Sequence, residues 1–78
     1  MSESIVKSEI TGCIWEVLVA PGDQVAAEDA LLLIESMKME IPVVTPVSGR
    51  VKSVNVSKND MVNEGDDLIV IDGQTQAG

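Results

Sequence analysis

Apolar and polar positions alternate along this chain in short runs rich in β-branched residues. Val54 and Val56 flank Asn55, and Val17 and Val19 form a similar run in the first half. A two-residue period is typical of strands that bury one face. The runs are separated by turn-forming segments at residues 21–23, 46–49, 58–60 and 64–66. The pattern predicts a β protein with short, regularly spaced strands.

The strand pattern occurs twice, because residues 12–35 align without gaps on residues 49–72 at an offset of 37. Identical pairs include Gly12/Gly49, Val17/Val54, Val19/Val56, Asp23/Asp60, Val25/Val62, Asp29/Asp66, Leu31/Leu68 and Ile34/Ile71. Two units that cannot cover their own apolar faces are expected to close on each other. We therefore predict an all-β fold of eight short strands. It is a flattened barrel or sandwich of two four-stranded antiparallel sheets with pseudo-two-fold symmetry.

Residues 23–40 considered alone could form an amphipathic helix, since Ala30, Leu33, Ile34 and Met37 have helical spacing. The second copy argues against this interpretation. Its residues 61–72 contain a glycine and a run of β-branched residues, which favour a strand over a helix. Because both copies should share one fold, we predict strands in both.

Residues 36–48 join the two copies and have no evident counterpart in the repeat. We expect Ser36–Met39 to form the tip of a hairpin between strands at Leu31–Glu35 and Glu40–Val44. Pro42 lacks a backbone N–H group, so the returning strand should be an edge strand or carry a bulge there.

Lys38 lies at this tip between two methionines, Met37 and Met39. An exposed lysine is usually only a solubilising charge. Here, however, the heptapeptide Ile34–Glu40 resembles the attachment motif of biotinyl domains, the biotin carboxyl carriers of biotin-dependent carboxylases. The resemblance covers about residues 10–72 and includes the turns and strands of both copies.

The resemblance implies that Lys38 is covalently biotinylated by a biotin protein ligase. The modified domain would shuttle carboxyl groups between a biotin carboxylase and a carboxyltransferase, as a monomeric carrier that catalyses nothing itself. Met37 and Met39 would serve recognition by the ligase and later carboxylation, while Glu35 and Glu40 would shape the electrostatics of the tip. Ser36 completes the attachment motif.

Lipoyl domains share this architecture and also modify a hairpin lysine. Their lysine is typically preceded by Asp and followed by a small residue, so Met37 and Met39 favour biotin. A lipoyl-type acyl carrier is the alternative function.

Two features depart from the family pattern. The first copy begins Ile10-Thr11-Gly12, where the family often has Met-Pro-Gly. Glu28 occupies the position matching Gly65, where the family usually has glycine at a turn. If that turn requires a positive φ, Glu28 carries strain of about 1 kcal/mol.

Composition excludes several function classes. The chain has 5 Lys and Arg against 13 Asp and Glu, a net charge of −8 and one aromatic residue, so nucleic-acid binding is not expected. It has no histidine and one cysteine, which excludes Ser–His and Cys–His catalysis, an internal disulfide and a cysteine metal site. We expect no catalytic residue and no bound metal.

The remaining expectations concern boundaries and location. Residues 1–73 should form one small domain and residues 74–78 a flexible C-terminal tail. The longest aliphatic run, Ala30–Ile34, is far too short to span a membrane. With no basic region followed by an apolar core at the N-terminus, a soluble, cytoplasmic protein is expected.

Three other functions are weaker. An acyl carrier protein would use Ser36, but that family is a helical bundle with Asp before its serine and Leu after it. The acidic residues 60–65 might suggest calcium, yet Val62 and Ile71 occupy two ligand positions of an EF-hand loop. A purely structural barrel would leave the placement of Lys38 unexplained.

Overall fold

The computed structural model describes residues 2–73 of the chain, which form eight strands joined by turns. The strands are β1 (Ser2–Lys7), β2 (Gly12–Val17), β3 (Gln24–Val25), β4 (Ala30–Ser36), β5 (Met39–Val44), β6 (Gly49–Val54), β7 (Met61–Val62) and β8 (Asp67–Gly73). Sheet A has the order β1-β8-β6-β3 and sheet B the order β5-β4-β2-β7, with antiparallel pairing throughout. The predicted fold class is confirmed, and the segment that could have been helical contains β3, β4 and the start of β5.

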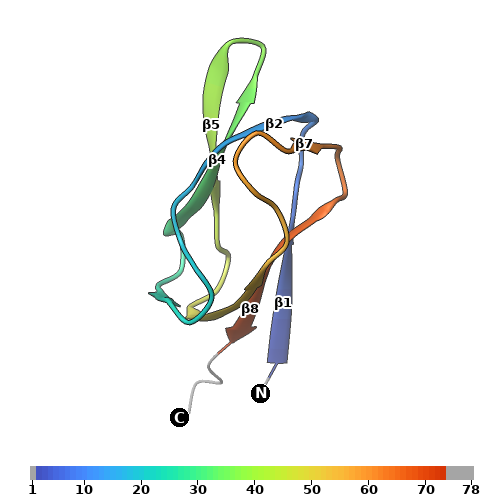
Figure 1. Cartoon of the computed structure of the whole chain (residues 1–78). Helices are drawn as coiled ribbons and strands as arrows, with labels where there is room; N and C mark the ends of the chain where they lie inside the picture. Colours follow the sequence, from blue (N-terminus) through green and yellow to red (C-terminus); the bar gives the residue numbers. More distant parts are fainter. Residues whose placement is uncertain (1, 74–78) are drawn as a thin grey trace.

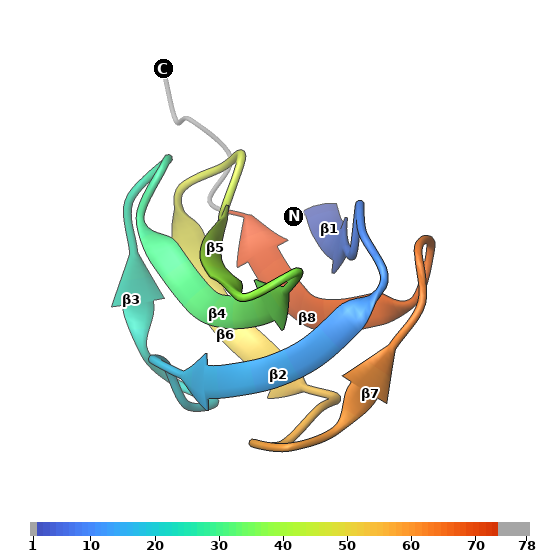
Figure 2. The same cartoon turned by 90° about the horizontal axis from the view of Figure 1, so that it is seen from above.

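The two sheets face each other as opposite walls of a flattened barrel (Figures 1 and 2). Each sheet takes its two central strands from one copy of the repeat and its two edge strands from the other copy. Neither copy therefore forms a sheet alone. The copies are interlocked, so each copy covers the apolar face of the other.

The repeat extends further than the sequence indicated, and the prediction that residues 36–48 lack a counterpart is wrong. Strand β5 is the equivalent of β1, because Ser36 pairs with Met39 as Gly73 pairs with Ser2. The copies are thus residues 2–36 and 39–73, and only two residues join them.

Two buried hydroxyls show the same equivalence. Thr45 Oγ1 donates a hydrogen bond to the carbonyl of Val47 at 2.7 Å, and Ser8 Oγ donates to the carbonyl of Ile10 at 2.5 Å. The partners lie two residues ahead in both cases, and the residues differ by the same offset of 37. Ser8 and Thr45 thus have the same local structure, although the difference in residue type makes this equivalence hard to see in the sequence.

Aspartates close the turns of both copies by accepting backbone hydrogen bonds. Asp23 and Asp60 accept from the amides three residues before them at 2.9 and 2.8 Å, and Asp29 and Asp66 do so at 2.9 and 2.8 Å. These carboxylates therefore have structural partners, including Asp60 of the acidic segment considered for calcium. Within residues 2–73 no group of three His, Cys, Asp or Glu residues is arranged to hold a metal ion.

The core lies between the sheets and is entirely aliphatic. Its buried residues are Val6, Ile14, Val25, Leu31, Leu32, Ile34, Val51, Val62, Leu68, Ile69 and Ile71. Most of them form equivalent pairs across the repeat. The one aromatic residue, Trp15, is not among them, because its side chain is 42% exposed.

Pro42 lies in β5, which is an edge strand of sheet B, so the edge-strand prediction is confirmed. The register shift between β4 and β5 falls between Ala30 and Leu32, not at Pro42. The prediction of a flexible tail at residues 74–78 lies outside the described residues. Within the described part of the chain, no helix has the length and apolar character needed to cross a membrane.

Equivalent turns contain equivalent backbone strain. Glu28 has φ 75° where Gly65 has φ 92°, and Asn59 has φ 78° where Gly22 has φ 97°. The left-handed conformation predicted for Glu28 is confirmed. Asparagine tolerates this region better than glutamate does, so Glu28 has the less suitable side chain of the two.

Replacing Glu28 by glycine should therefore stabilise the fold. Relief of the left-handed strain, less the added flexibility of glycine in the unfolded chain, should raise the free energy of unfolding by about 0.5–1 kcal/mol. For a chain of this length, thermal melting should shift upward by about 4 °C. The matched control is Gly65→Ala at the equivalent turn, which should lower the melting temperature. A lower melting temperature for Glu28→Gly would contradict the strain argument.

Candidate functional site

The candidate site is the tip of the β4–β5 hairpin, which projects from one end of the barrel (Figure 1). Pairing between β4 and β5 continues to Ser36 and Met39, leaving only Met37 and Lys38 in the loop. Pairing between β4 and its other neighbour, β2, ends at Glu35. The two loop residues therefore lie beyond the last pair that the sheet provides.

Both loop residues have a positive φ, 54° for Met37 and 65° for Lys38. Two successive positive φ angles in a two-residue hairpin loop are the signature of a type I′ turn, which normally uses Asn-Gly or Asp-Gly. Neither methionine nor lysine favours this region, and each residue costs roughly 1–2 kcal/mol there. Strain of this kind that persists in a fold points to a function for the side chains involved.

The tip displays its side chains to solvent. Met37 is 90% exposed and Met39 is 63% exposed, although methionine is normally a core residue. Lys38 is also exposed, and no carboxylate within residues 2–73 lies within 4.0 Å of its Nζ atom. A long unbranched amine held in this way is free to be acylated and then to swing about the end of the hairpin.

Glu35 and Glu40 are directly opposite each other, one pair below the tip, and both side chains are exposed. Like charges at facing positions in adjacent strands destabilise a sheet. Neither carboxylate makes an ion pair with a lysine or arginine of the described chain. The structure thus brings both predicted acidic residues to the base of the tip and leaves their charges uncompensated.

Ser36 and the first residues of β2 hold the base of the hairpin. Ser36 Oγ donates a hydrogen bond to the carbonyl of Thr11 at 3.2 Å, so this hydroxyl has a structural partner. A Cβ atom on Gly12 would lie only 2.6 Å from the carbonyl oxygen of Glu35 and 2.7 Å from Cγ2 of Ile34. The close approach of β2 to β4 explains why glycine stands here although the residues before it depart from the family pattern.

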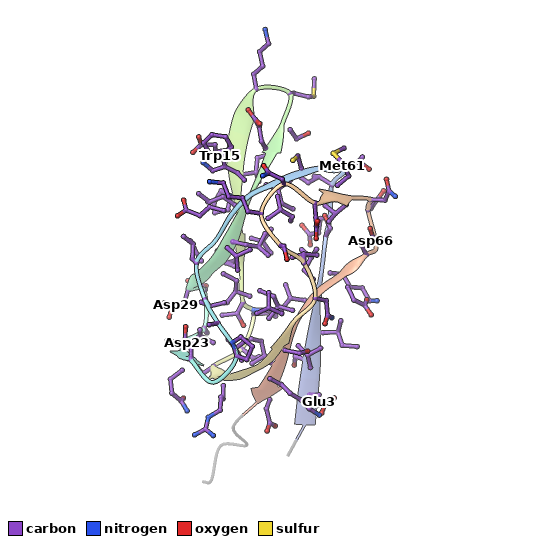
Figure 3. All side chains as sticks on the ribbon, viewed as in Figure 1. Glu3, Trp15, Asp23, Asp29, Met61 and Asp66 are labelled. Atoms are coloured by element: carbon purple, nitrogen blue, oxygen red, sulfur yellow. The ribbon has the colours of Figure 1, made fainter. Side chains whose placement is uncertain are left out.

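The sequence did not indicate that Trp15 lies near this site. Trp15 is the extra residue of a bulge in β2, between the pairs Ile14–Ile34 and Glu16–Leu33. Figure 3 shows its side chain beside the β4–β5 hairpin, below the tip. A comparison of the two copies at an offset of 37 would have flagged it, because the equivalent residue is Lys52.

Lys52 occupies the same bulge position in β6, between the pairs Val51–Ile71 and Ser53–Val70. It forms an ion pair with Glu3 across β8. The hydrogen bond to Glu3 and the charges of Glu3 and Asp72 raise the pKa of Lys52. This arrangement is the counterpart of Trp15 beside the hairpin, but at the other end of the barrel.

Comparison with known proteins gives a consistent result. Residues 2–71 match the family model described as "Biotin-requiring enzyme". The chain is 48% identical over 66 residues to the "Biotinylated protein TB7.3 homolog" of Mycobacterium leprae, covering 85% of this chain and 93% of the relative. It is 44% identical over 71 residues to the "Biotin/lipoyl attachment protein" of Bacillus subtilis, covering 91% and 97% of the two chains.

The fold also matches a segment of a large solved enzyme. The crystal structure of Kluyveromyces lactis urea carboxylase aligns with a TM-score of 0.86 and 38% sequence identity. The match covers 91% of this chain and 6% of that enzyme. The fold described above therefore occurs there as a small part of a much longer chain.

Because the turn is strained, residues that suit positive φ should stabilise the hairpin, although they remove the side chains of the candidate site. The double variant Met37→Asn with Lys38→Gly should raise the free energy of unfolding by about 1–2 kcal/mol, because these residues suit positive φ. Chemical denaturation of both proteins measures the difference. Lys38→Ala is the control, since it removes the charge but keeps a side chain with the same φ penalty, and it should not stabilise. Equal stability of the double variant and the wild type would contradict the type I′ assignment.

Proposed function

This chain belongs to the biotin/lipoyl attachment family, and we propose that it is a biotin carboxyl carrier with biotin attached to Lys38. The observation that carries the proposal is the placement of Lys38 at the exposed, strained two-residue turn between the two copies. The relative from Mycobacterium leprae, named as a biotinylated protein, supports the same role.

The residues at the tip fit a covalently attached cofactor. Condensation of the carboxyl group of biotin with the Nζ amine, with net loss of water at the expense of ATP, would form an amide and remove the positive charge of Lys38. The bound biotin supplies the carboxyl-carrying chemistry, and the protein supplies a rigid end from which the arm extends. Met37 and Met39 would then offer apolar contacts on either side of the arm to enzymes that act on it.

The proposal includes the partners and setting of the domain. A biotin protein ligase would modify Lys38, and a biotin carboxylase and a carboxyltransferase would use the modified lysine. Residues 1–73 would act as a single monomeric, non-catalytic domain in the cytoplasm. Tethering would raise the local concentration of the cofactor at each enzyme far above that of free biotin.

A lipoyl-type acyl carrier is the second candidate. The name of the Bacillus subtilis relative includes both biotin and lipoyl attachment, which supports lipoylation as the alternative modification. Both functions would use the same lysine on the same hairpin. The exposed methionines at positions 37 and 39 are the feature that favours biotin over lipoate.

The substitution Lys38→Arg should abolish biotinylation and leave the fold intact. Arginine keeps the positive charge, but its guanidinium is not an acylation target under these conditions. We expect intact mass spectrometry to show a biotin adduct on the wild type and none on the variant, after incubation with a biotin protein ligase, ATP and biotin.

Lys58→Arg is the matched control, because Lys58 is also an exposed lysine in a turn. This variant should accept biotin as the wild type does. Biotin retained by Lys38→Arg, or lost from Lys58→Arg, would place the attachment site elsewhere.

A further inference from the structure

The two copies of the repeat are joined mainly by strand pairing from one copy to the other. Only the pairs β2–β4 and β6–β8 lie within a copy, whereas β1–β8, β3–β6, β4–β5 and β2–β7 connect the copies. None of these four pairings depends on which chain supplies each copy. The first copy of one chain could therefore form the same sheets with the second copy of another chain.

The covalent connection between the copies is the turn at Met37 and Lys38. Within residues 2–73, Cys13 is a free thiol, so no disulfide links the copies there. The turn lies beyond the last pair, Ser36–Met39, on a hairpin that projects from the barrel (Figure 1). Both turn residues are exposed, so opening the turn uncovers no buried side chain.

Backbone strain acts against the closed turn. Met37 and Lys38 have φ angles of 54° and 65°, a region that neither residue type favours. An extended connection would return both residues to negative φ. A short flexible connection holds its two ends at an effective concentration of about millimolar. Strain at each turn residue lowers that value roughly tenfold, which favours partners from another chain.

We propose that a second chain of the same sequence is a partner of this domain, through exchange of the two copies. Residues 2–36 of each chain pack with residues 39–73 of the other, which gives two barrels with all the pairings of the monomer. Met37 and Lys38 become an extended connection between the barrels. Short connections under strain are known to favour such exchange, which is a low-cost route to a dimer.

Exchange also changes the setting of Lys38. In the monomer this lysine stands at the end of a projecting hairpin, but in the exchanged dimer it lies between two barrels and no longer in a turn. The dimer therefore shields Lys38 from a biotin protein ligase, and the monomer is the form that accepts biotin. This consequence rests on the proposed function of Lys38, whereas the exchange itself does not.

Refolding at low and high protein concentration tests the exchange. Because neither copy forms a sheet alone, exchange requires unfolding, so each protein is unfolded in guanidinium chloride and refolded by dialysis. Size-exclusion chromatography with light scattering then measures the dimer fraction. We expect the wild type to give monomer at low concentration and dimer at high concentration. The dimer should persist when it is diluted under native conditions.

Two variants of the turn should shift this balance in opposite directions. Met37→Asn with Lys38→Gly suits positive φ and should need a concentration at least about tenfold higher for the same dimer fraction. Met37→Pro fixes φ near about −65°, which the closed turn does not allow, and should give dimer at both concentrations. Glu28→Gly is the control, because it relieves similar strain in a turn within the first copy and should leave the dimer fraction unchanged.

A disulfide across β4 and β5 distinguishes exchange from ordinary association. Glu35 faces Glu40 in the second copy and Cys13 in the first copy. With Cys13→Ser, Glu35→Cys and Glu40→Cys together, oxidised glutathione should link the two thiols between chains in the dimer. The oxidised dimer should run as a dimer on a denaturing gel without reductant. Glu35→Cys alone is the control, since its disulfide with Cys13 stays within one chain and the same dimer should run as a monomer.

The outcomes separate the exchange from its consequence for Lys38. A wild type that is monomeric after refolding at every concentration, or a dimer that the Glu35–Glu40 disulfide does not link, would overturn the exchange. Equal dimer fractions in the wild type and the double turn variant would overturn the role of strain. A purified biotin protein ligase with ATP and biotin should modify the wild-type dimer at least about tenfold more slowly than the monomer. Equal rates would overturn the shielding alone, and a monomer that accepts no biotin would contradict the proposed function but not the exchange.

Discussion

The structure depends on a connection of only two residues between two interlocked copies of one unit. Ser36 and Met39 are paired, so the chain must reverse direction within Met37 and Lys38. Reversal over two residues with the twist of the flanking strands requires positive φ at both positions, and the structure has it. The same connection puts Lys38 at the end of the barrel opposite the pair formed by Ser2 and Gly73. A lysine in this place is far from the ends of the described chain and free of the body of the domain.

The internal repeat allows residues at equivalent positions of the two copies to be compared in the same backbone environment. Positions that serve the fold have similar residues in both copies, such as the turn aspartates Asp23 and Asp60 and the core residues Leu31 and Leu68. Trp15 and Lys52 differ between the copies although each is the extra residue of an equivalent bulge. Each copy thus acts as a control for the other, because equivalent residues share one backbone environment.

Much of the fold could be predicted from the sequence because the repeat and the turn chemistry are local and strong. The strand assignment, the edge position of Pro42 and the strained Glu28 followed from them. The equivalence of β1 and β5 could not be seen, because few of their residues are identical and the hydrogen bonds of Ser8 and Thr45 depend on tertiary context. Lys38 was found through its motif, but the conformation of its turn was not, since methionine and lysine are poor turn formers. Trp15 was missed because a bulge sets its place beside the hairpin.

We propose that this domain carries biotin, and only biotin, on Lys38. The most direct measurement is peptide mass spectrometry of the wild-type chain after expression with a biotin ligase and a lipoate ligase together, with both cofactors supplied. We expect one biotinyl group on the peptide that contains Lys38 and no lipoyl group on any peptide. A lipoyl group on Lys38 would assign the domain to the acyl carriers instead, and the absence of any adduct would contradict a carrier function altogether.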